Sequence, residues 1–178
     1  MDMSAADLSA RAARIRLACF DVDGSLTDGR LIYLPGGGEA KAFHVHDGLG
    51  LRLLEENGIA VALVTARQVP VVDLRADDLK LSAVCQGVKD KAAMVKQLAD
   101  ERGLELDQVA FFGDDLPDLP AIRLVGFAAG PADAHPWLAA HLHWQSPQRG
   151  GQGAARAFCD LLLEAQGRRD AVLARFGG

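Results

Sequence analysis

The sequence has few of the features that mark nucleic-acid-binding or membrane-spanning proteins. Only 6% of its 178 residues are aromatic, and 19 Lys and Arg stand against 24 Asp and Glu, a formal net charge of −5. A general nucleic-acid binder carries an excess of basic residues, which this chain does not have. No segment approaches the roughly 20 apolar residues of a membrane span. We therefore expect neither nucleic acid nor a membrane as a partner.

Cysteine is also scarce, and the N-terminus lacks a leader pattern. Cys19, Cys85 and Cys159 are scattered through apolar stretches without a CxxC spacing. An odd, scattered set argues against a disulfide framework and against a zinc site, so we expect buried, reduced thiols. The first residues include early aspartates and no apolar run, unlike a secretory signal peptide. These features predict a cytoplasmic protein.

The length bounds the organisation of the chain. With 49% hydrophobic residues, the chain fits one globular domain with a sizeable core, and we expect residues 1–178 to form that single domain. It is too short for a catalytic domain plus an independent substrate domain. If the protein is an enzyme, something else must serve as a lid.

Short apolar runs alternate with longer amphipathic stretches, which is typical of βαβ units around a parallel sheet. The strands are almost continuously apolar, which indicates that helices cover both faces of the sheet. Gly58 and Gly103 stand where helix C-caps belong. The predicted strands are 15–20, 59–64, 83–85, 109–112 and 126–129, and the predicted helices are 49–56, 69–79, 89–102 and 116–124.

Residues 25–46 interrupt this alternation directly after the first strand. Two alternating runs, RLIYL and AKAFHV, are separated by PGGGE, which predicts a small β-hairpin with a glycine-rich turn. Its apolar side chains are Leu31, Tyr33, Phe43 and Val45. A lone hairpin is marginally stable, so we expect it to pair with copies of itself, the alternative being that it folds back on its own core.

The C-terminal region, 150–178, is predicted to be a helix followed by a short tail. The helix is opened by the glycine-rich segment RGGQG at 149–153. This segment either helps to shape a functional site across subunits or is a plain loop before the helix.

Two aspartates follow the first predicted strand in the motif Asp21-Val22-Asp23-Gly24-Ser25. In an open α/β sheet, ligands bind beyond the carboxyl ends of the strands, so both carboxylates stand where chemistry is expected. Gly24 permits a tight turn that would splay the two side chains. Alone, the motif could equally be a turn signal with a capping aspartate. A calcium-binding EF-hand is disfavoured because its further acidic positions are absent.

Polar groups also follow the second and third predicted strands. In Thr65-Ala66-Arg67, a hydroxyl and free backbone N–H groups can bind a phosphoryl oxygen, although Thr65 alone could cap a helix. Lys91 lies at a helix start, against the preference of the helix dipole, which points to an anionic partner. Lys89 is expected to be solvated.

Three carboxylates follow the fourth predicted strand, in the segment GDDLPD at 113–118. They would repel one another unless a cation or hydrogen-bond donors compensate. Oxygen ligands beside a phosphate site favour Mg²⁺. The alternative is an acidic loop in which Asp118 caps a helix. A purely structural role is plausible for each of these motifs taken alone. It is not plausible that four such motifs stand at four successive strand ends by coincidence.

Taken in order, DVDGSLTDG, VTAR, GVKDK and GDDLPD resemble the motifs of the haloacid dehalogenase superfamily of phosphotransferases. The resemblance runs from about Arg16 to Asp118. It implies a Rossmann-like, three-layer α/β/α fold with a central parallel sheet. It also implies that Asp21 is the nucleophile that forms an aspartyl-phosphate, and that Asp23 is the general acid that later activates water.

The same resemblance implies a phosphate site and Mg²⁺ as cofactor. A phosphoryl transition state spreads negative charge over its oxygens, so a cation, a lysine and backbone donors are the expected stabilising groups. The implied phosphate-binding residues are Thr65, Ala66 and Lys91, and the implied metal ligands are Asp21, Asp114 and the backbone carbonyl of Asp23.

The spacing leaves no room for the cap domain that superfamily members usually carry, because Asp21 to Thr65 spans 44 positions and Thr65 to Lys91 spans 26. With GEAKAFHVHDGLGLRLL and RGGQGAAR, the chain resembles the capless subgroup to about Asp160. That resemblance implies a phosphomonoester hydrolase acting on 3-deoxy-D-manno-octulosonate (Kdo) 8-phosphate in lipopolysaccharide precursor synthesis. It also implies a tetramer whose hairpins close neighbouring active sites.

A sugar acid needs a cation for its carboxylate besides the phosphate site. Arg67 and Arg75 are candidates because a guanidinium matches a carboxylate bidentately. Lys41 and His46 lie on the predicted hairpin and complete the candidate substrate-binding set. Many relatives have arginine where His46 stands.

Two alternatives remain open at this point. One is a phosphatase for another sugar acid phosphate, such as a nonulosonate 9-phosphate, which His46 keeps open. The other is a non-catalytic oligomerising domain of the same fold, against which the intact pair Asp21 and Asp23 counts.

Overall fold

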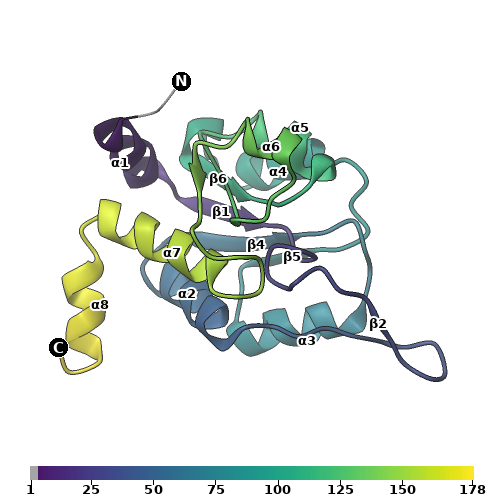
Figure 1. The fold of residues 1–178 in the computed structure, drawn as a ribbon. Helices are drawn as coiled ribbons and strands as arrows, with labels where there is room; N and C mark the ends of the chain where they lie inside the picture. Colours follow the sequence, from purple (N-terminus) through teal and green to yellow (C-terminus); the bar gives the residue numbers. More distant parts are fainter. Residues whose placement is uncertain (1–3) are drawn as a thin grey trace.

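The computed structural model describes residues 4–178 and has a six-stranded sheet at its centre (Figure 1). The strand order is β5-β4-β1-β6-β7-β8, and every neighbouring pair is parallel. The predicted α/β class is therefore confirmed. The strands are β1 Leu17–Phe20, β4 Ala60–Val64, β5 Ala83–Cys85, β6 Val109–Phe112, β7 Phe127–Gly130 and β8 Trp144–Gln145.

Helices cover both faces of this sheet, which gives the three layers expected from the apolar strands (Figure 1). One face packs against α1, α2, α3 and α7, and the other against α4, α5 and α6. The helices are α1 Ala5–Arg14, α2 Val45–Glu56, α3 Pro70–Leu79, α4 Lys91–Asp100, α5 Leu119–Ile122, α6 Pro136–Ala139, α7 Ala154–Ala165 and α8 Arg169–Arg175.

Alternation along the strands builds a separate core on each face. Phe112 belongs to the cluster under α2 and α7, where its ring lies 5.4 Å from that of Phe158. Phe111 points to the opposite face and packs in the cluster with Val95 and Leu98 of α4. Successive side chains of a strand point to opposite faces, so consecutive apolar residues fill both cores.

Several elements lie outside the predicted pattern. Helices α1 and α6, strand β8 and the short α8 in the expected tail were not predicted. The expected helix 116–124 is a 3₁₀ turn, η2 Leu116–Asp118, followed by the single turn α5. Gly58 and Gly103 have φ values of +82° and +62°, the left-handed conformation that ends helices.

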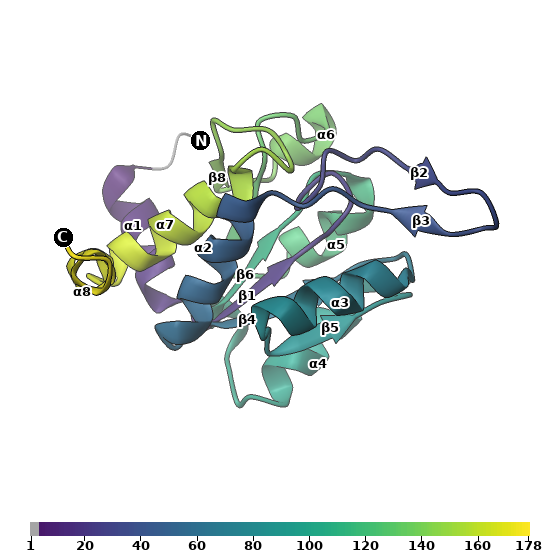
Figure 2. The same ribbon diagram turned by 90° about the horizontal axis from the view of Figure 1, so that it is seen from below.

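The hairpin is present but shorter than predicted, and it projects from the body of the molecule (Figure 2). Its strands, β2 Ile32–Tyr33 and β3 Glu39–Ala40, pair antiparallel. The prediction that the second arm continues to His46 was wrong. Phe43 instead packs against the core, and His46 lies in the first turn of α2, where it is exposed. Packing of Phe43 draws the chain away from its partner strand.

Burial of the cysteines follows their strand positions. Cys19 and Cys159 are buried as predicted, whereas Cys85 is half-buried because β5 is an edge strand. The first three residues of the N-terminal segment that was compared with a signal peptide lie outside the described residues. Within residues 4–178, no helix is long and apolar enough to span a bilayer.

Candidate active site

Sheet topology brings the sequence motifs together. β1 lies between β4 and β6, so the direction of strand succession reverses at β1. Such a switch point leaves a crevice at the carboxyl ends of the strands. A cavity of about 290 Å³ opens there. Among the predicted residues, its lining includes Asp21, Asp23, Thr65, Ala66, Arg67, Lys91 and Asp114.

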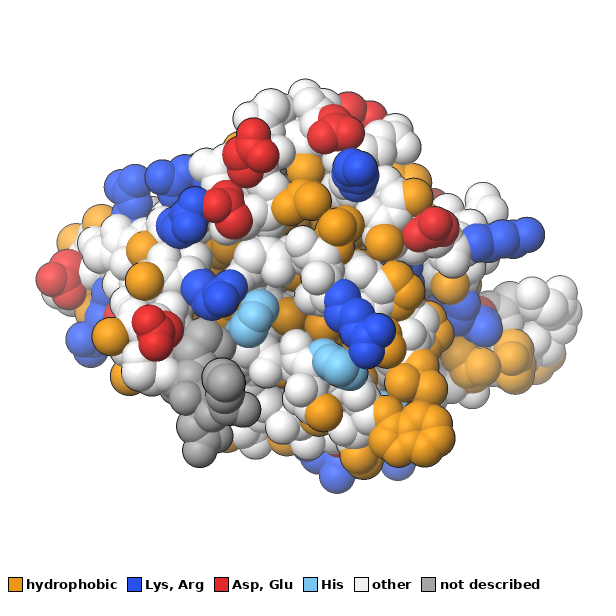
Figure 3. Space-filling view, turned by 90° about the horizontal axis from the view of Figure 1, so that it is seen from above, with side chains coloured by type: hydrophobic (Ala, Val, Ile, Leu, Met, Phe, Trp, Pro, Cys, Tyr) orange, Lys and Arg blue, Asp and Glu red, His pale blue; other side chains and the backbone are white. Residues whose placement is uncertain are grey.

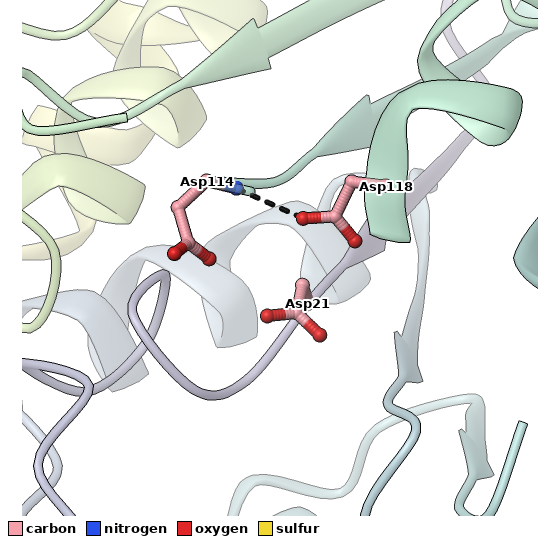
Figure 4. A group of neighbouring side chains, drawn as sticks. All are labelled: Asp21, Asp114 and Asp118. Atoms are coloured by element: carbon pink, nitrogen blue, oxygen red, sulfur yellow. Dashed lines mark hydrogen bonds between the residues drawn. The ribbon is translucent and has the colours of Figure 1, made fainter. Parts of the chain in front are cut away.

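Three carboxylates that line this cavity lie close together (Figure 4). Asp21, Asp114 and Asp118 each offer one oxygen, and these atoms lie within 4.8 Å of one another. Burial, followed by the charge of Asp118, raises the pKa of Asp21 to about 7. Burial, followed by the charges of Asp21 and Asp118, raises the pKa of Asp114 to about 8. The cluster is therefore short of positive charge.

This donor set fits a magnesium ion. Carboxylate oxygens are the ligands that Mg²⁺ prefers in proteins. A Cβ atom added at Gly24 would collide with the carboxylate of Asp114, so the backbone that follows Asp23 lies directly against the cluster. Gly24 has a φ of +88°, and a side chain here would be both strained and obstructed.

Lys91 supplies the positive charge inside the cluster. Its side chain is only 4% exposed, and its Nζ lies 2.5 Å from both Asp21 and Asp118. Burial opposes its charged form, but the charges of Asp21 and Asp118 outweigh that effect and raise its pKa. Lys91 therefore stays charged and holds the predicted nucleophile in place, while Lys89 is exposed as expected.

Asp118 is the residue that the predicted site set omitted: it was counted among the three carboxylates of GDDLPD, but the only individual role considered for it was that of a helix cap. It is 1% exposed and accepts hydrogen bonds from the backbone N–H groups of Asp114, at 2.9 Å, and Asp115, at 3.3 Å. These bonds shape the turn after β6 and aim its carboxylate at Lys91. The motif GDDLPD held the signal, since the last carboxylate of a tight turn can reach back to its start.

A second charged group surrounds Asp23. Lys41, on the arm after β3, forms an ion pair with Asp23 and lies 2.8 Å from Glu39. Glu39 also forms an ion pair with Arg67. The hydrogen bond from Lys41, together with that from Arg67, lowers the pKa of Glu39. The hairpin thus reaches residues that line the cavity of its own chain.

Three of the four predicted substrate-binding residues do not line the cavity of their own chain. Arg75 on α3 lies over the ring of Phe43, 5.7 Å from its centroid, and 3.1 Å from Asp78. His46 is exposed at the start of α2. The side chain of Lys41 is buried and is absent from the cavity lining, so of the predicted substrate-binding set only Arg67 lines the cavity.

The glycine-rich segment 149–153 packs directly on the loop after β1. A Cβ at Gly150 would overlap the backbone of Gly24, and the N–H of Gly151 donates to the carbonyl of Ser25 at 3.1 Å. Buried Asp47 of α2 accepts hydrogen bonds from Gly153, at 3.3 Å, and the N–H of Arg156, at 2.8 Å. Only glycine allows the two backbones to approach so closely.

No family model matches the chain. Over 161 residues it is 43% identical to 3-deoxy-D-manno-octulosonate 8-phosphate phosphatase KdsC of Yersinia pestis, an alignment that covers 90% of this chain and 86% of the relative. The chain belongs to this phosphatase family. A solved structure of the Moraxella catarrhalis phosphatase, in complex with magnesium, phosphate and Kdo, is 40% identical with a TM-score of 0.95. It covers 97% of this chain and 99% of that one.

A further solved structure connects this phosphatase family to the superfamily that the motifs resemble. The chain is 39% identical to a hydrolase of haloacid dehalogenase superfamily subfamily III A from Legionella pneumophila, with a TM-score of 0.92. That match covers 97% of this chain and 96% of the other. The resemblance stated from the motifs is thereby confirmed.

The crowded carboxylates of this phosphatase predict a stability that depends on pH and metal. With folded pKa values of about 7 for Asp21 and about 8 for Asp114, the folded state holds protons that the unfolded state loses near pH 4. Without divalent cations, stability should therefore fall as the pH rises from about 4 to about 8.

Urea unfolding in EDTA at pH 6 and pH 8.5 would measure this decline. Magnesium should raise the unfolding midpoint more at pH 8.5 than at pH 6, because protons compete with the metal. Equal stabilisation at both pH values would contradict a carboxylate metal site.

Proposed function

We propose that the chain is a magnesium-dependent phosphatase that hydrolyses Kdo 8-phosphate to Kdo and inorganic phosphate, a step in lipopolysaccharide precursor synthesis. The observation that carries this proposal is the buried cluster of Lys91 and three carboxylates in one cavity. It supplies ligands for both ions that the Moraxella relative holds beside Kdo. A domain that only oligomerises does not require a buried lysine among carboxylates.

Asp21 is the proposed nucleophile. Its carboxylate oxygen attacks phosphorus, and the bond between phosphorus and the sugar oxygen breaks. Asp23 donates a proton to that leaving oxygen. It then takes a proton from the water that attacks the aspartyl-phosphate, so that inorganic phosphate leaves and Asp21 is regenerated. Asp23 lines the same cavity as Asp21, as this division of labour requires.

The remaining residues hold the phosphoryl group and the cofactor. Lys91, the Thr65 hydroxyl and the backbone N–H of Ala66 are the proposed donors to the phosphoryl oxygens. The proposed magnesium ligands are Asp21, Asp114 and the carbonyl of Asp23, with Asp118 holding the cluster together. When bound, magnesium neutralises the carboxylates and the phosphate charge.

For the sugar acid carboxylate we propose Arg67, which is 38% exposed and lines the cavity. Arg75 and His46 lie outside their own chain's cavity, so their proposed part in substrate binding requires that they reach the cavity of another copy. The proposal is therefore that the second half of substrate recognition is completed in an oligomer, a tetramer formed through the hairpins.

The hairpin surface supports that assembly. Ile32, Tyr33 and Leu34 are 46%, 71% and 47% exposed, and apolar side chains lie along one side of the projection at the right of Figure 3. On the face shown there, acidic and basic side chains are interspersed. An exposed apolar two-stranded ribbon is stabilised by pairing with another copy.

The double substitution Ile32→Asp and Tyr33→Asp should therefore convert the oligomer to a monomer, because charges would be buried in the interface. Light scattering coupled to size exclusion would measure the mass. Leu173→Asp, at a site 47% exposed on α8, is the matched control and should leave the mass unchanged. A monomeric unmodified chain at micromolar concentration would refute the assembly.

Phosphate release from a panel of sugar phosphates, with magnesium and with EDTA, tests the function. Kdo 8-phosphate should be the preferred substrate and EDTA should abolish turnover. A preference for a nonulosonate 9-phosphate would select the other sugar acid, whereas a preference for a simple hexose phosphate would overturn the assignment.

We further propose that residues 1–178 act as one catalytic domain and that the protein is located in the cytoplasm. Cell fractionation would test the location.

A further inference from the structure

Glu39 has no part in the chemistry proposed above, yet it lies at the centre of the second charged group. It stands in β3, at the base of the hairpin, and its side chain is 9% exposed. One carboxylate oxygen contacts Lys41 and the other contacts Arg67. Glu39 therefore contacts two cations, one of which lines the cavity.

The second charged group consists of Asp23, Glu39, Lys41 and Arg67, and its two cations have different surroundings. Lys41 is 1% exposed and lies between Glu39 and Asp23, so both of its neighbours are anions. Arg67 is 38% exposed and lines the cavity, which neither Glu39 nor Lys41 does. Of the two cations, Arg67 is thus the one that substrate can reach. Glu39 forms an ion pair with Arg67 but is not itself part of the cavity lining.

Arg67 has a competing partner in Asp23. Its Nε lies 3.8 Å from Oδ2 of Asp23, and both atoms are buried without a hydrogen-bond partner. Buried polar atoms without partners are costly, so Arg67 would close this gap if it were released. The ion pair with Glu39 holds one edge of the guanidinium and keeps it from moving onto Asp23.

We propose that Glu39 is a positioning residue that sets the specificity of the site for acidic sugars. It presents the edge of Arg67 that does not contact Glu39 to the carboxylate of the substrate and keeps Arg67 off the carboxylate of Asp23. This inference rests on the proposed function. A guanidinium fork recognises a carboxylate only when its plane is fixed, so loss of the grip costs recognition of the acid group.

The opposite role for Glu39 would be that of a substrate mimic. Its carboxylate would then occupy Arg67 until the substrate displaced it, and removing it would tighten binding of the sugar acid. The geometry favours positioning, because Arg67 has five N–H donors and Glu39 contacts it from outside the cavity lining.

The test compares two esters, Kdo 8-phosphate and p-nitrophenyl phosphate, which lacks a carboxylate. The measured quantity is the ratio of their kcat/KM values. Glu39→Gln preserves side-chain volume but not charge, and it should lower the ratio about tenfold to a hundredfold, mainly through KM for the sugar acid. Glu101→Gln, at an exposed glutamate beyond the far end of α4, is the matched control.

A double-mutant cycle separates positioning from general damage. In an Arg67→Met background, Glu39→Gln should change the ratio by less than about twofold, because the group it positions is gone. Glu39→Asp keeps the charge and should retain more of the preference than Glu39→Gln. Thermal unfolding of each variant would identify any that fails to fold.

Three results would overturn the inference. A lower KM for Kdo 8-phosphate in Glu39→Gln would make Glu39 a substrate mimic. An equal loss in both Arg67 backgrounds would show that Glu39 does not act through Arg67. Equal losses for both esters in Glu39→Asp and Glu39→Gln would indicate a structural role only. Failure of the proposed function is distinguishable, since the unmodified enzyme would then show no preference for Kdo 8-phosphate.

Discussion

Asp21→Asn should reduce phosphate release from Kdo 8-phosphate by roughly 10³-fold or more, because an amide cannot form the aspartyl-phosphate. The same substitution should raise the stability of the metal-free protein at pH 8. It removes one of three crowded carboxylates that lie within 4.8 Å of one another. Steady-state phosphate release and urea unfolding in EDTA would measure the two effects.

This combination of lost activity and gained stability separates a nucleophile from a structural aspartate. Asp73→Asn, at an exposed position of α3, is the matched control and should alter neither quantity. Substantial activity in Asp21→Asn would exclude the nucleophile role. A large loss of stability would show instead that the ion pair with Lys91 outweighs the repulsion among the carboxylates.

Lys91→Met should lower kcat by about 10² to 10³-fold, the usual cost of removing one donor that stabilises transition-state charge. It should also destabilise the metal-free protein at pH 8 by about 3–5 kcal/mol, because Asp21 and Asp118 lose the cation 2.5 Å away from each. Methionine keeps the length and apolar stem of lysine. The two measurements are single-turnover kinetics and urea unfolding.

Lys89→Met is the matched control, since Lys89 is exposed two positions before Lys91 and should show neither effect. Added magnesium should restore part of the stability of Lys91→Met but not its kcat, because a cation can replace the charge among the carboxylates without donating to the phosphoryl group. Unchanged kcat in this variant would remove Lys91 from the phosphate site.

Much of the fold could be predicted because its signals are local. An apolar run of four or five residues that ends in a polar motif indicates a buried parallel strand, and β5 and β6 begin and end where they were predicted. Among the elements that were missed, β8 and α6 are two and four residues long, which is too few for a periodic pattern, so only packing reveals them. The missed α1 is ten residues long, so shortness does not explain its omission.

The hairpin shows the limit of pattern reading. An alternating run predicted that its second arm reaches His46, but α2 begins at Val45. The same residues satisfy a strand pattern and the first turn of a helix. Burial of Phe43 and Asp47 against other elements decides between them, and that burial depends on segments distant in the sequence.

The sequence by itself determined the fold class and the chemistry of the cavity. Its polar motifs follow strands, and parallel strands end at the same edge of their sheet, so Asp21, Thr65 and Asp114 had to meet there. Only the tertiary structure decided which charges become partners. The contact of Lys91 with Asp118 and the ion pair of Glu39 with Arg67 exist only because the loops lie within a few ångströms of particular positions. Coulomb interactions and desolvation change steeply over that distance, while the sequence records only which charges are available.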